Sequence, residues 1–420
     1  MRVRSVAVAA AAALTVAACG GSDDDTAGGD GGGSAEVTVW MYPVIPDQDA
    51  SIAFWDQVEA DFEAEHDDID LTIEQQPWEG RDEKIATAIA SGQGPDLVLL
   101  TPDQTLQYQV SGGLKPLDGA VEDDRDAYLP SALDVVTFED ELYGVPIYHT
   151  STTTAYNMAA FQAAGFTEPP ATWDDVMAAA PALAANGVSV LDYSGSPETT
   201  LNLTFYPLLW QAGGTVFTED GSDVAFDGPE GLEALQFLLD LQEAGGLPAE
   251  AATKTNLVDG GPLTTGATAM TYSITLPDIQ IMRTSLGAEN VVVGAPLAGE
   301  EQVSFGIPGV LALTSINDDE DAAYEVASFI ASPDVNAALN AEAGTFPART
   351  DVEDPTGDDA LATLSDALQY ARPGEVEPTS RQVMTVLSAQ LQAALQGSKS
   401  PEDALADAAS EARDLIARGG

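Results

Sequence analysis

Strand and helix patterns alternate from the beginning of the folded part of this chain, and this alternation restricts the fold more than any other feature. The segments 36–40, 71–76 and 97–100 have the alternating or continuous apolar pattern of β-strands. Helical patterns cover about 50–65 and 82–91, between these strands. Successive strands that are connected through helices run in the same direction. We therefore predict an α/β fold built on a parallel sheet.

The remainder of the chain continues with mixed elements. No period of 20–50 residues repeats, so a solenoid is not expected. The length of 420 residues is sufficient for two or three packed domains. Further extended segments are expected at 141–148 and 152–157, and further helices at 173–185, 229–244, 322–331, 359–370, 382–396 and 401–418.

The charge of the chain excludes several classes of partner. Asp and Glu number 69 against 14 Lys and Arg, which gives a formal net charge of -55. Such a surface repels phosphate backbones and anionic lipid headgroups, so we expect no binding to nucleic acid and none to membranes through a basic patch. The acids are scattered along the chain, which suggests a protein solvated in high salt, where screening weakens the self-repulsion. An acidic secreted protein without a salt requirement is the alternative.

The scarcity of cysteine and histidine excludes several kinds of chemistry. With one cysteine (Cys19) and two histidines (His66 and His149), neither an intrachain disulfide nor a Cys/His zinc cluster can form. We expect no metal and no cofactor. A Ser/His/Asp triad needs one of the two histidines, and His66 lies in the acidic stretch 61–68, which favours a solvated surface position.

The N-terminus indicates the compartment. Basic residues followed by the apolar run 6–18 are typical of a secretory signal peptide, here 1–18, which is removed on export. The run ends in a segment that resembles the lipobox of bacterial lipoproteins, with Cys19 at the lipidated position. An ordinary signal peptide with a chance cysteine is the alternative. The Gly/Ser/Asp-rich residues that follow predict a flexible tether over 19–35. We expect an extracytoplasmic protein anchored to the outer face of the cell membrane.

Nine local patterns follow one another in a family-specific order. They are FWDQVEADFEAEH at 54–66, IASGQGPD at 89–96, GLKPL at 113–117, YGVP at 143–146, PATWDD at 170–175, AGG at 212–214, TGATAM at 265–270, the helical segment 321–331 followed by Ser332 and Pro333, and TFPAR at 345–349. With these patterns in this order, the chain resembles the extracellular solute-binding proteins of ABC importers, in the group that binds sugars and oligosaccharides. The resemblance covers nearly the whole mature chain.

The resemblance implies a periplasmic-binding-protein-like α/β fold with two lobes, a ligand cleft between them and three hinge crossovers. The crossovers are expected near 146–150, 293–296 and 342–349. It also implies a sugar ligand, an ABC transporter permease as partner, a monomer, and no enzymatic activity. The resulting division is lobe 1 at 36–147 and 294–343, and lobe 2 at 148–293 and 344–420.

Aromatic rings are candidates to stack on sugar rings, because pyranose faces are flat and partly apolar. The candidates lie after strands, at the first crossover or before the 212–214 glycines: Trp78, Tyr148, Tyr206, Trp210, Tyr272 and Phe305. Packing in a lobe core is the alternative for each of them. Phe305 precedes Gly306, where a missing side chain would let the backbone approach a ligand. Residues assigned to the cores are Trp40, Phe54, Trp55, Trp173 and Phe329.

Polar candidates follow from the rule that ligands bind at the carboxyl ends of strands in open α/β sheets. This rule selects Tyr42, Asp103 and Gln104, and the resemblance implies that Asp103 contacts ligand hydroxyls. Asn202, Arg349 and Arg372 complete the set, with an interlobe salt bridge as the alternative for Arg349. Thr150 stands near the place where some family members carry an acidic hydroxyl binder, so the length and identity of the sugar stay open.

Two alternative functions remain at this stage. The same fold can bind a polyamine or another small solute, although His149 with Asp103 is a thin basis for a metal site. A lipid-anchored glycosidase with paired carboxylates is the second alternative. The chain contains no Gly-x-Ser-x-Gly motif, and its abundant acids produce chance carboxylate pairs that discriminate nothing.

Overall fold

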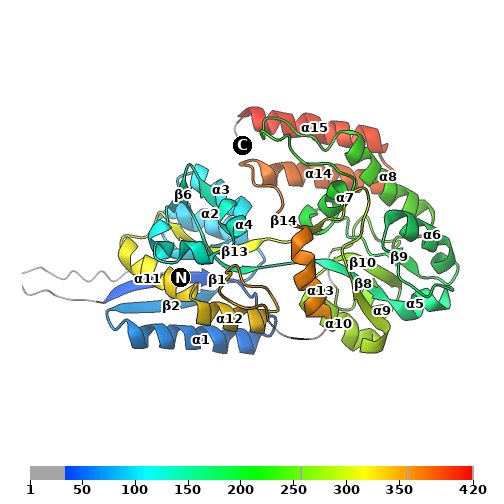
Figure 1. Cartoon of the computed structure of the whole chain (residues 1–420). Helices are drawn as coiled ribbons and strands as arrows, with labels where there is room; N and C mark the ends of the chain where they lie inside the picture. The colour runs from blue at the N-terminus through cyan, green and yellow to red at the C-terminus, as the bar shows by residue number, and fades with distance from the viewer. Residues whose placement is uncertain (1–33, 256–257, 356, 358, 419–420) are drawn as a thin grey trace, which may run out of the picture. The chain divides into compact units, whose positions relative to one another are not determined.

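The structure is a computed structural model that describes residues 34–255, 258–355, 357 and 359–418. The predicted signal peptide (1–18), Cys19 and nearly all of the predicted tether lie outside these residues. Helices and strands alternate along the described chain (Figure 1). The helices are α1 (Gln48–Glu65), α2 (Arg81–Ser91), α3 (Pro102–Val110), α4 (Pro130–Asp134), α5 (Met158–Ala163), α6 (Trp173–Ala184), α7 (Phe205–Gln211), α8 (Pro229–Glu243), α9 (Pro262–Thr265), α10 (Leu276–Leu286), α11 (Glu320–Ile330), α12 (Pro333–Ala343), α13 (Asp359–Ala367), α14 (Ser380–Leu395) and α15 (Pro401–Arg418).

Most strands belong to two separate sheets, which confirms the predicted α/β class. The strands are β1 (Ala35–Met41), β2 (Ile69–Gln75), β3 (Leu97–Leu100), β4 (Leu114–Lys115), β5 (Thr137–Phe138), β6 (Glu141–Leu142), β7 (Val145–His149), β8 (Thr153–Asn157), β9 (Ser189–Leu191), β10 (Thr268–Ile274), β11 (Val291–Gly294), β12 (Ser304–Phe305), β13 (Pro308–Thr314) and β14 (Ala371–Arg372).

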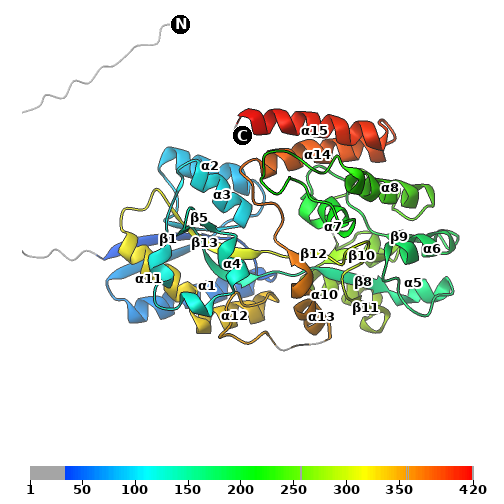
Figure 2. The same ribbon diagram turned by 45° about the horizontal axis from the view of Figure 1, so that its top comes forward.

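The first sheet has the order β2-β1-β3-β13-β4, with β7 also paired to β13. β1, β2 and β3 are parallel, as the alternation of strands and helices predicted, and β13 is antiparallel to β3. Every residue of β3 is buried, because helices cover both faces of the sheet: α2 and α3 lie on one side, α1 and α12 on the other (Figure 2). Trp40 and Trp55 lie in this core, as predicted. We call this half of the molecule the first lobe.

The second sheet has the order β11-β8-β10-β9. β8 is antiparallel to β10 and β11, and β10 is buried along its whole length. α6 begins at a capping box in which Thr172 and Asp175 satisfy each other's backbone amides, so that Trp173 enters the core as predicted. The C-terminal helices α14 and α15 pack on the same core. We call this half the second lobe.

The chain passes between the two sheets three times, and these passages are bonded to one another. Thr150 exchanges backbone and side-chain hydrogen bonds with Ile307, and Thr152 does the same with Phe305. His149 also pairs with Phe346, which comes shortly before the third passage, because residues 348 and 350 still bond to 127–129 of the first lobe. A side chain at Gly306 would collide with the Thr150 carbonyl oxygen at 2.4 Å, so the glycine allows two hinge strands to approach, rather than a ligand.

The pairing of strands places two passages later in the chain than the sequence predicted. β7 extends through His149, so the first passage is 150–152. β11 pairs with β8, and Phe305 belongs to the second core, so the chain returns to the first sheet between 305 and 308 rather than at 293–296. The full division of the chain between the lobes stays a prediction.

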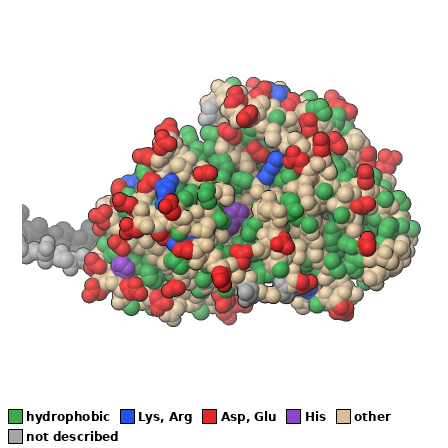
Figure 3. Space-filling view, viewed as in Figure 1, with side chains coloured by type: hydrophobic (Ala, Val, Ile, Leu, Met, Phe, Trp, Pro, Cys, Tyr) green, Lys and Arg blue, Asp and Glu red, His purple; other side chains and the backbone are tan. Residues whose placement is uncertain are grey.

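Acidic side chains are spread over the visible face of the molecule and do not form a single patch (Figure 3). This agrees with their scattered distribution in the sequence. Among the described helices, none is both long and apolar enough to cross a bilayer.

Candidate functional site: a cleft between the two lobes

A cleft of about 1000 Å³ lies between the lobes and beside the three hinge passages. It lies at the carboxyl ends of β1 and β3, which is where open α/β sheets place their ligands. Its lining comes from both lobes and the hinge and includes Trp78, Arg81, Asp82, Thr101, Asp103, Tyr148, Ser151, Thr152, Glu198, Thr200, Asn202, Leu203, Thr275, Leu276, Phe305, Gly344 and Arg381.

Trp78 provides an aromatic surface on the first-lobe side. Its side chain is 46% exposed, although its indole nitrogen donates a hydrogen bond to the Pro43 carbonyl. The ring of Tyr42 stacks against it with centroids 5.0 Å apart, and Tyr42 itself is fully buried. Tyr42 therefore does not line the cleft but supports Trp78. A rigid, partly exposed indole is a suitable platform for a flat ligand.

Arg81 lies beside this aromatic pair. It is the first residue of α2, and Gly80 before it adopts a positive φ of 70° that turns the chain into the helix. The guanidinium lies 4.6 Å from the Tyr42 ring and 5.0 Å from the Trp78 ring. One terminal nitrogen donates to the Leu99 carbonyl at 2.9 Å, whereas Nε has no hydrogen-bond partner among the described residues. Burial lowers the pKa of Arg81, yet a guanidinium stays charged at any physiological pH.

Asp103 lies in the first turn of α3 and lines the cleft. One carboxylate oxygen accepts a hydrogen bond from the Thr101 hydroxyl at 2.5 Å. The other accepts from Nε of Arg381, at 2.7 Å, and Arg381 comes from the second lobe. Gln104 is fully buried and bonds to Asp82, so it lies behind the cleft wall. Asp103 is therefore already bonded before any ligand enters.

The second-lobe side and the hinge contribute mainly hydroxyl and amide groups. Ser151, Thr200, Asn202 and Thr275 line this side. The Ser151 hydroxyl and the Asn202 carbonyl oxygen are buried and have no partner among the described residues. Unsatisfied buried polar atoms are costly, so a ligand or water that bonds to them is favoured. Phe305 adds a small apolar surface to the lining.

The sequence matches the family of bacterial extracellular solute-binding proteins over residues 46–337. The chain belongs to this family. A protein of Brucella abortus whose name describes it as a binding protein is 24% identical over 373 residues, which are 86% of this chain and 90% of that protein.

Two solved structures share the fold. The GacH receptor of Streptomyces glaucescens is 22% identical with a TM-score of 0.77, over 91% of this chain and 99% of that one. The cyclic alpha-maltosyl-1,6-maltose binding protein of Arthrobacter globiformis is 24% identical with a TM-score of 0.75, over 92% and 100%.

Three aromatic candidates lie in the core of the second lobe of this solute-binding protein and do not line its cleft. Tyr206 and Trp210 are each 1% exposed, and Tyr272 is 2% exposed. The Trp210 indole nitrogen donates to Glu375 at 3.2 Å, and the Tyr272 hydroxyl donates to the Thr204 carbonyl at 2.6 Å. Burial raises the pKa of Tyr206 and Tyr272 well above the ordinary tyrosine value. Their contribution is to the packing of the lobe.

The two arginine candidates also have partners outside the cleft. Arg349 is buried in the first lobe, where it forms ion pairs with Asp124 at 2.6 Å and with Asp351 at 2.8 Å. It is therefore not a bridge between the lobes. Arg372 pairs with Glu301 at 3.2 Å, within the second lobe. Tyr148, by contrast, lines the cleft next to the hinge, and burial raises its pKa to about 12.

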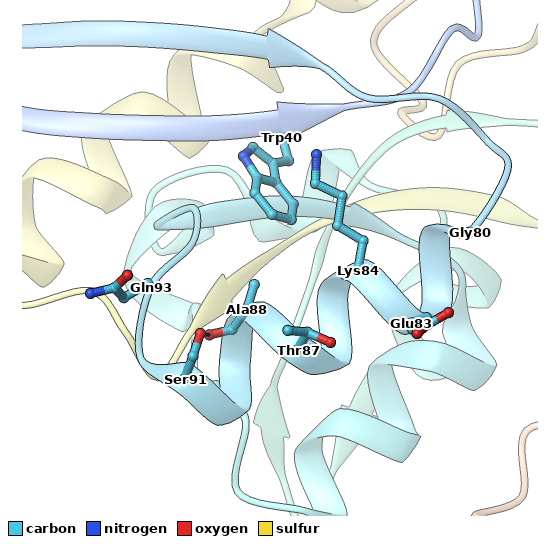
Figure 4. Close-up of a pocket in the computed structure, with 8 residues that line it drawn as sticks. All are labelled: Trp40, Gly80, Glu83, Lys84, Thr87, Ala88, Ser91 and Gln93. Carbon is cyan, nitrogen blue, oxygen red and sulfur yellow. Dashed lines mark hydrogen bonds between the residues drawn. The ribbon is translucent and has the colours of Figure 1, made fainter. Parts of the chain in front are cut away.

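A second, smaller hollow of about 450 Å³ lies on the outside of the first lobe along α2 (Figure 4). Trp40 and Lys84 point toward one another there, with the ammonium 4.7 Å from the centre of the ring. The Trp40 nitrogen donates to Glu74. Trp40 is only 8% exposed, whereas Trp78 is 46% exposed, so we assign the binding site to the larger cleft.

Sequence reasoning missed Arg81, Ser151, Thr200 and Arg381. The scarcity of arginine was a usable signal, but it was applied only to Arg349 and Arg372. Arg81 and Arg381 come directly before the predicted helices 82–91 and 382–396, and they lie in the first turns of α2 and α14. No local pattern distinguishes Ser151 or Thr200 from other hinge and loop residues. Among the described residues, no group of three His, Cys, Asp or Glu side chains is placed to hold a metal.

Proposed function

We propose that this solute-binding protein captures a carbohydrate in its cleft and delivers it to the permease of an ABC importer. The observation that carries the proposal is that the exposed indole of Trp78 lines the same cleft as polar atoms of Arg81, Ser151 and Asn202 that have no hydrogen-bond partner within the described part of the chain. An aromatic face and planar hydrogen-bonding groups are the two elements that sugar recognition requires. The cleft volume of about 1000 Å³ suits a ligand larger than a single small metabolite.

The names of related proteins support a sugar ligand. The GacH receptor has been solved in complex with acarbose, and the Arthrobacter protein is named for binding a cyclic maltosyl-maltose. A protein of Halalkalibacterium halodurans that is 28% identical over 180 residues is named an arabinooligosaccharide-binding protein. These ligands differ from one another, so the proposal extends to the class of carbohydrates and not to one sugar.

We further propose that lipidated Cys19 anchors the protein outside the cytoplasmic membrane. The support is the lipobox-like end of the apolar run and the position there of the chain's single cysteine. Cys19→Ser should release the protein into the medium or leave the precursor unprocessed. A Ser variant that stays membrane-bound at its mature size contradicts lipid anchoring, without affecting the ligand proposal.

The cleft geometry disfavours both alternative functions. A polyamine would bring its cations close to the guanidinium groups of Arg81 and Arg381, which line the cleft. A glycosidase needs one carboxyl group that holds a proton. Asp82 and Asp103 are both engaged in ion pairs with Arg381.

Thermal unfolding in the presence of candidate ligands tests the proposal. The purified protein is screened with maltotriose, arabinooligosaccharides, cyclic maltosaccharides and spermidine at millimolar concentration. A ligand at 100 times its dissociation constant stabilises the native state by about 2.7 kcal/mol, which raises the melting temperature by several degrees. We expect such a shift with a saccharide. A shift with spermidine alone, or the release of cleaved products from the saccharides, contradicts the proposed function.

A further inference from the structure

One side chain crosses the cleft from the second lobe to the first. Arg381 is in the first turn of α14, whose buried residues belong to the second core. Its guanidinium bonds to two carboxylates of the first lobe, Asp82 in the first turn of α2 and Asp103 in the first turn of α3. We name these three residues the cross-cleft bridge. All three line the candidate site.

The contacts of the bridge are short and come from separate atoms. Nη1 of Arg381 lies 2.7 Å from Asp82, and Nε lies 2.7 Å from Asp103. Nη2 lies 3.4 Å from the Thr101 hydroxyl. Charge-assisted bonds from two different nitrogens to two separate carboxylates fix the guanidinium in direction as well as in distance. A rotation of the lobes that moved α14 by a few ångströms would separate these atoms.

The carboxylates are held in place from behind. The side-chain amide of Gln104 donates to Asp82, and the Thr101 hydroxyl donates to Asp103. Their positions therefore depend on the first lobe alone, whereas the position of Arg381 depends on the second. At another part of the cleft, Leu276 of the second lobe packs on Gly344 with no charge involved. The cross-cleft bridge is thus the ionic part of the contact between the lobes at the cleft.

The charge of the chain makes such a bridge effective. With a net charge of -55, the two lobes repel each other, and closing the cleft brings acidic surfaces together. A single guanidinium placed between two first-lobe carboxylates opposes this repulsion where the lobes meet. The Arg381 side chain is 36% exposed, so added salt weakens the attraction as well as the repulsion.

We propose that Arg381 is a positioning residue that holds the two lobes closed over the cleft through Asp82 and Asp103. The bridge acts on the conformation of the empty protein and on the residence time of the ligand, and it does not depend on the identity of the ligand. The second effect rests on the proposed carbohydrate function. The first effect does not, and it is the basis of the test.

Small-angle X-ray scattering of the ligand-free protein measures closure directly. Arg381→Met removes the charge and keeps much of the side-chain volume. Arg413→Met is the matched control, because Arg413 also bonds to two carboxylates, Asp223 and Asp227, but within the second lobe. At about 0.05 M NaCl, where screening is weak, we expect a larger radius of gyration for Arg381→Met than for wild type, and no change for Arg413→Met.

Salt distinguishes an ionic bridge from a general loss of structure. In about 1 M NaCl, where the Debye length falls to about 3 Å, the difference between Arg381→Met and wild type should shrink. A radius of gyration equal to that of wild type at low salt overturns the proposal. An equal increase in the Arg413→Met control also overturns it, because loss of charge alone would then explain the result.

A variant in the first lobe tests the bridge independently, in case Arg381→Met does not fold. Asp82→Asn keeps the shape and removes one attraction, and the Asp82 side chain is half exposed, so we expect it to fold. It should expand the protein by less than Arg381→Met does.

With a saccharide found by the thermal screen, Arg381→Met should raise the dissociation rate roughly 3- to 10-fold and change the association rate little. If no saccharide binds, the proposed function fails while the scattering result still decides the bridge.

Discussion

The first-lobe wall of the cleft exposes a tryptophan ring beside charged groups, whereas the second-lobe wall combines hydroxyl and amide groups with Arg381 and has no comparably exposed ring among the described residues. Trp78 and Arg81 represent the first wall. Asn202 and Thr200 represent the second, and Trp210 lies behind them in the core. Stacking needs an open ring face, and a half-exposed indole has one whereas a fully buried indole does not.

The difference suggests an order of events in binding. Stacking on Trp78 needs only the first lobe, so an open protein can already hold a sugar there. The neutral hydrogen-bonding groups of the second lobe reach the ligand when the lobes close. The sequence predicted aromatic contacts from both lobes; the structure places exposed rings on one side. Variants on each wall, and behind it, test this asymmetry.

The largest effect is expected behind the second wall. Trp210→Ala should destabilise the folded protein by about 3–5 kcal/mol, the usual cost of removing a large buried aromatic side chain. Loss of the indole also leaves Glu375 without the N–H that it accepts, in a place where burial already raises the pKa of that carboxyl. Denaturant unfolding of the ligand-free protein measures this. An unchanged stability together with weakened sugar binding would place Trp210 in the site after all.

A smaller effect, on binding and not on stability, is expected at the first wall. Trp78→Ala should weaken sugar binding by about 1–3 kcal/mol, because it removes the exposed platform. The stability should change by less than about 1 kcal/mol, since the ring is half exposed. Calorimetric titration measures the affinity. Trp40→Phe is the control, since that ring is only 8% exposed and the affinity should not change. Equal losses in the two variants would refute the role of Trp78.

Single polar groups on the second wall should contribute less. Asn202→Ala removes a buried carbonyl oxygen that has no partner among the described residues, and Ser151→Ala removes a comparable hydroxyl at the hinge. Each should weaken sugar binding by about 1 kcal/mol, the usual net value of one neutral hydrogen bond. The loss should appear mainly in the dissociation rate, because these groups engage after closure. Losses larger than that of Trp78→Ala would reverse the proposed difference between the walls.

The overall architecture was accessible from the sequence because its signals are local. The parallel start of the first sheet followed from apolar periodicity over 36–100, and the helix predicted at 401–418 is α15. The sequence did not show which aromatic residues face the cleft and which lie in a core. All seven residues of α7 are buried, so the helix has no polar face to show which side meets the core. In such a helix, Tyr206 and Trp210 look the same in the sequence whether they face a cleft or a core.

The charged part of the site was missed for a different reason. Arg381 bonds to Asp103 and Asp82, which are 278 and 299 positions away in the sequence. In a chain with 69 acids, no local pattern shows which two a given arginine will meet. Arg349 illustrates the same limit, since its partner Asp124 is 225 positions away and lies in the same lobe. Long-range ion pairs are set by packing, and packing is known only from the folded structure.

The smallest effect is expected at the hinge, which joins the two walls. His149 is partly buried, its Nδ1 faces the Thr150 carbonyl at 2.8 Å, and desolvation lowers its pKa below the usual value near 6.5. In the unfolded chain the imidazole takes up a proton as the pH falls through about 6.5, whereas in the native hinge it stays neutral to lower pH. Stability contributed by neutral His149 is therefore present above that pH and is lost below it, by at most about 1.4 kcal/mol per pH unit.

The buried carboxyls Glu375 and Asp192 have raised pKa values and act in the opposite direction, so the wild type alone does not isolate the histidine. The difference in unfolding free energy between wild type and His149→Asn, measured from pH 8 to pH 5 at fixed chloride, cancels their contribution. We expect the unfolding free energy of wild type to fall relative to that of His149→Asn as the pH falls below about 6.5. A difference that stays constant over this range would show that the hinge histidine titrates as it does in the unfolded chain.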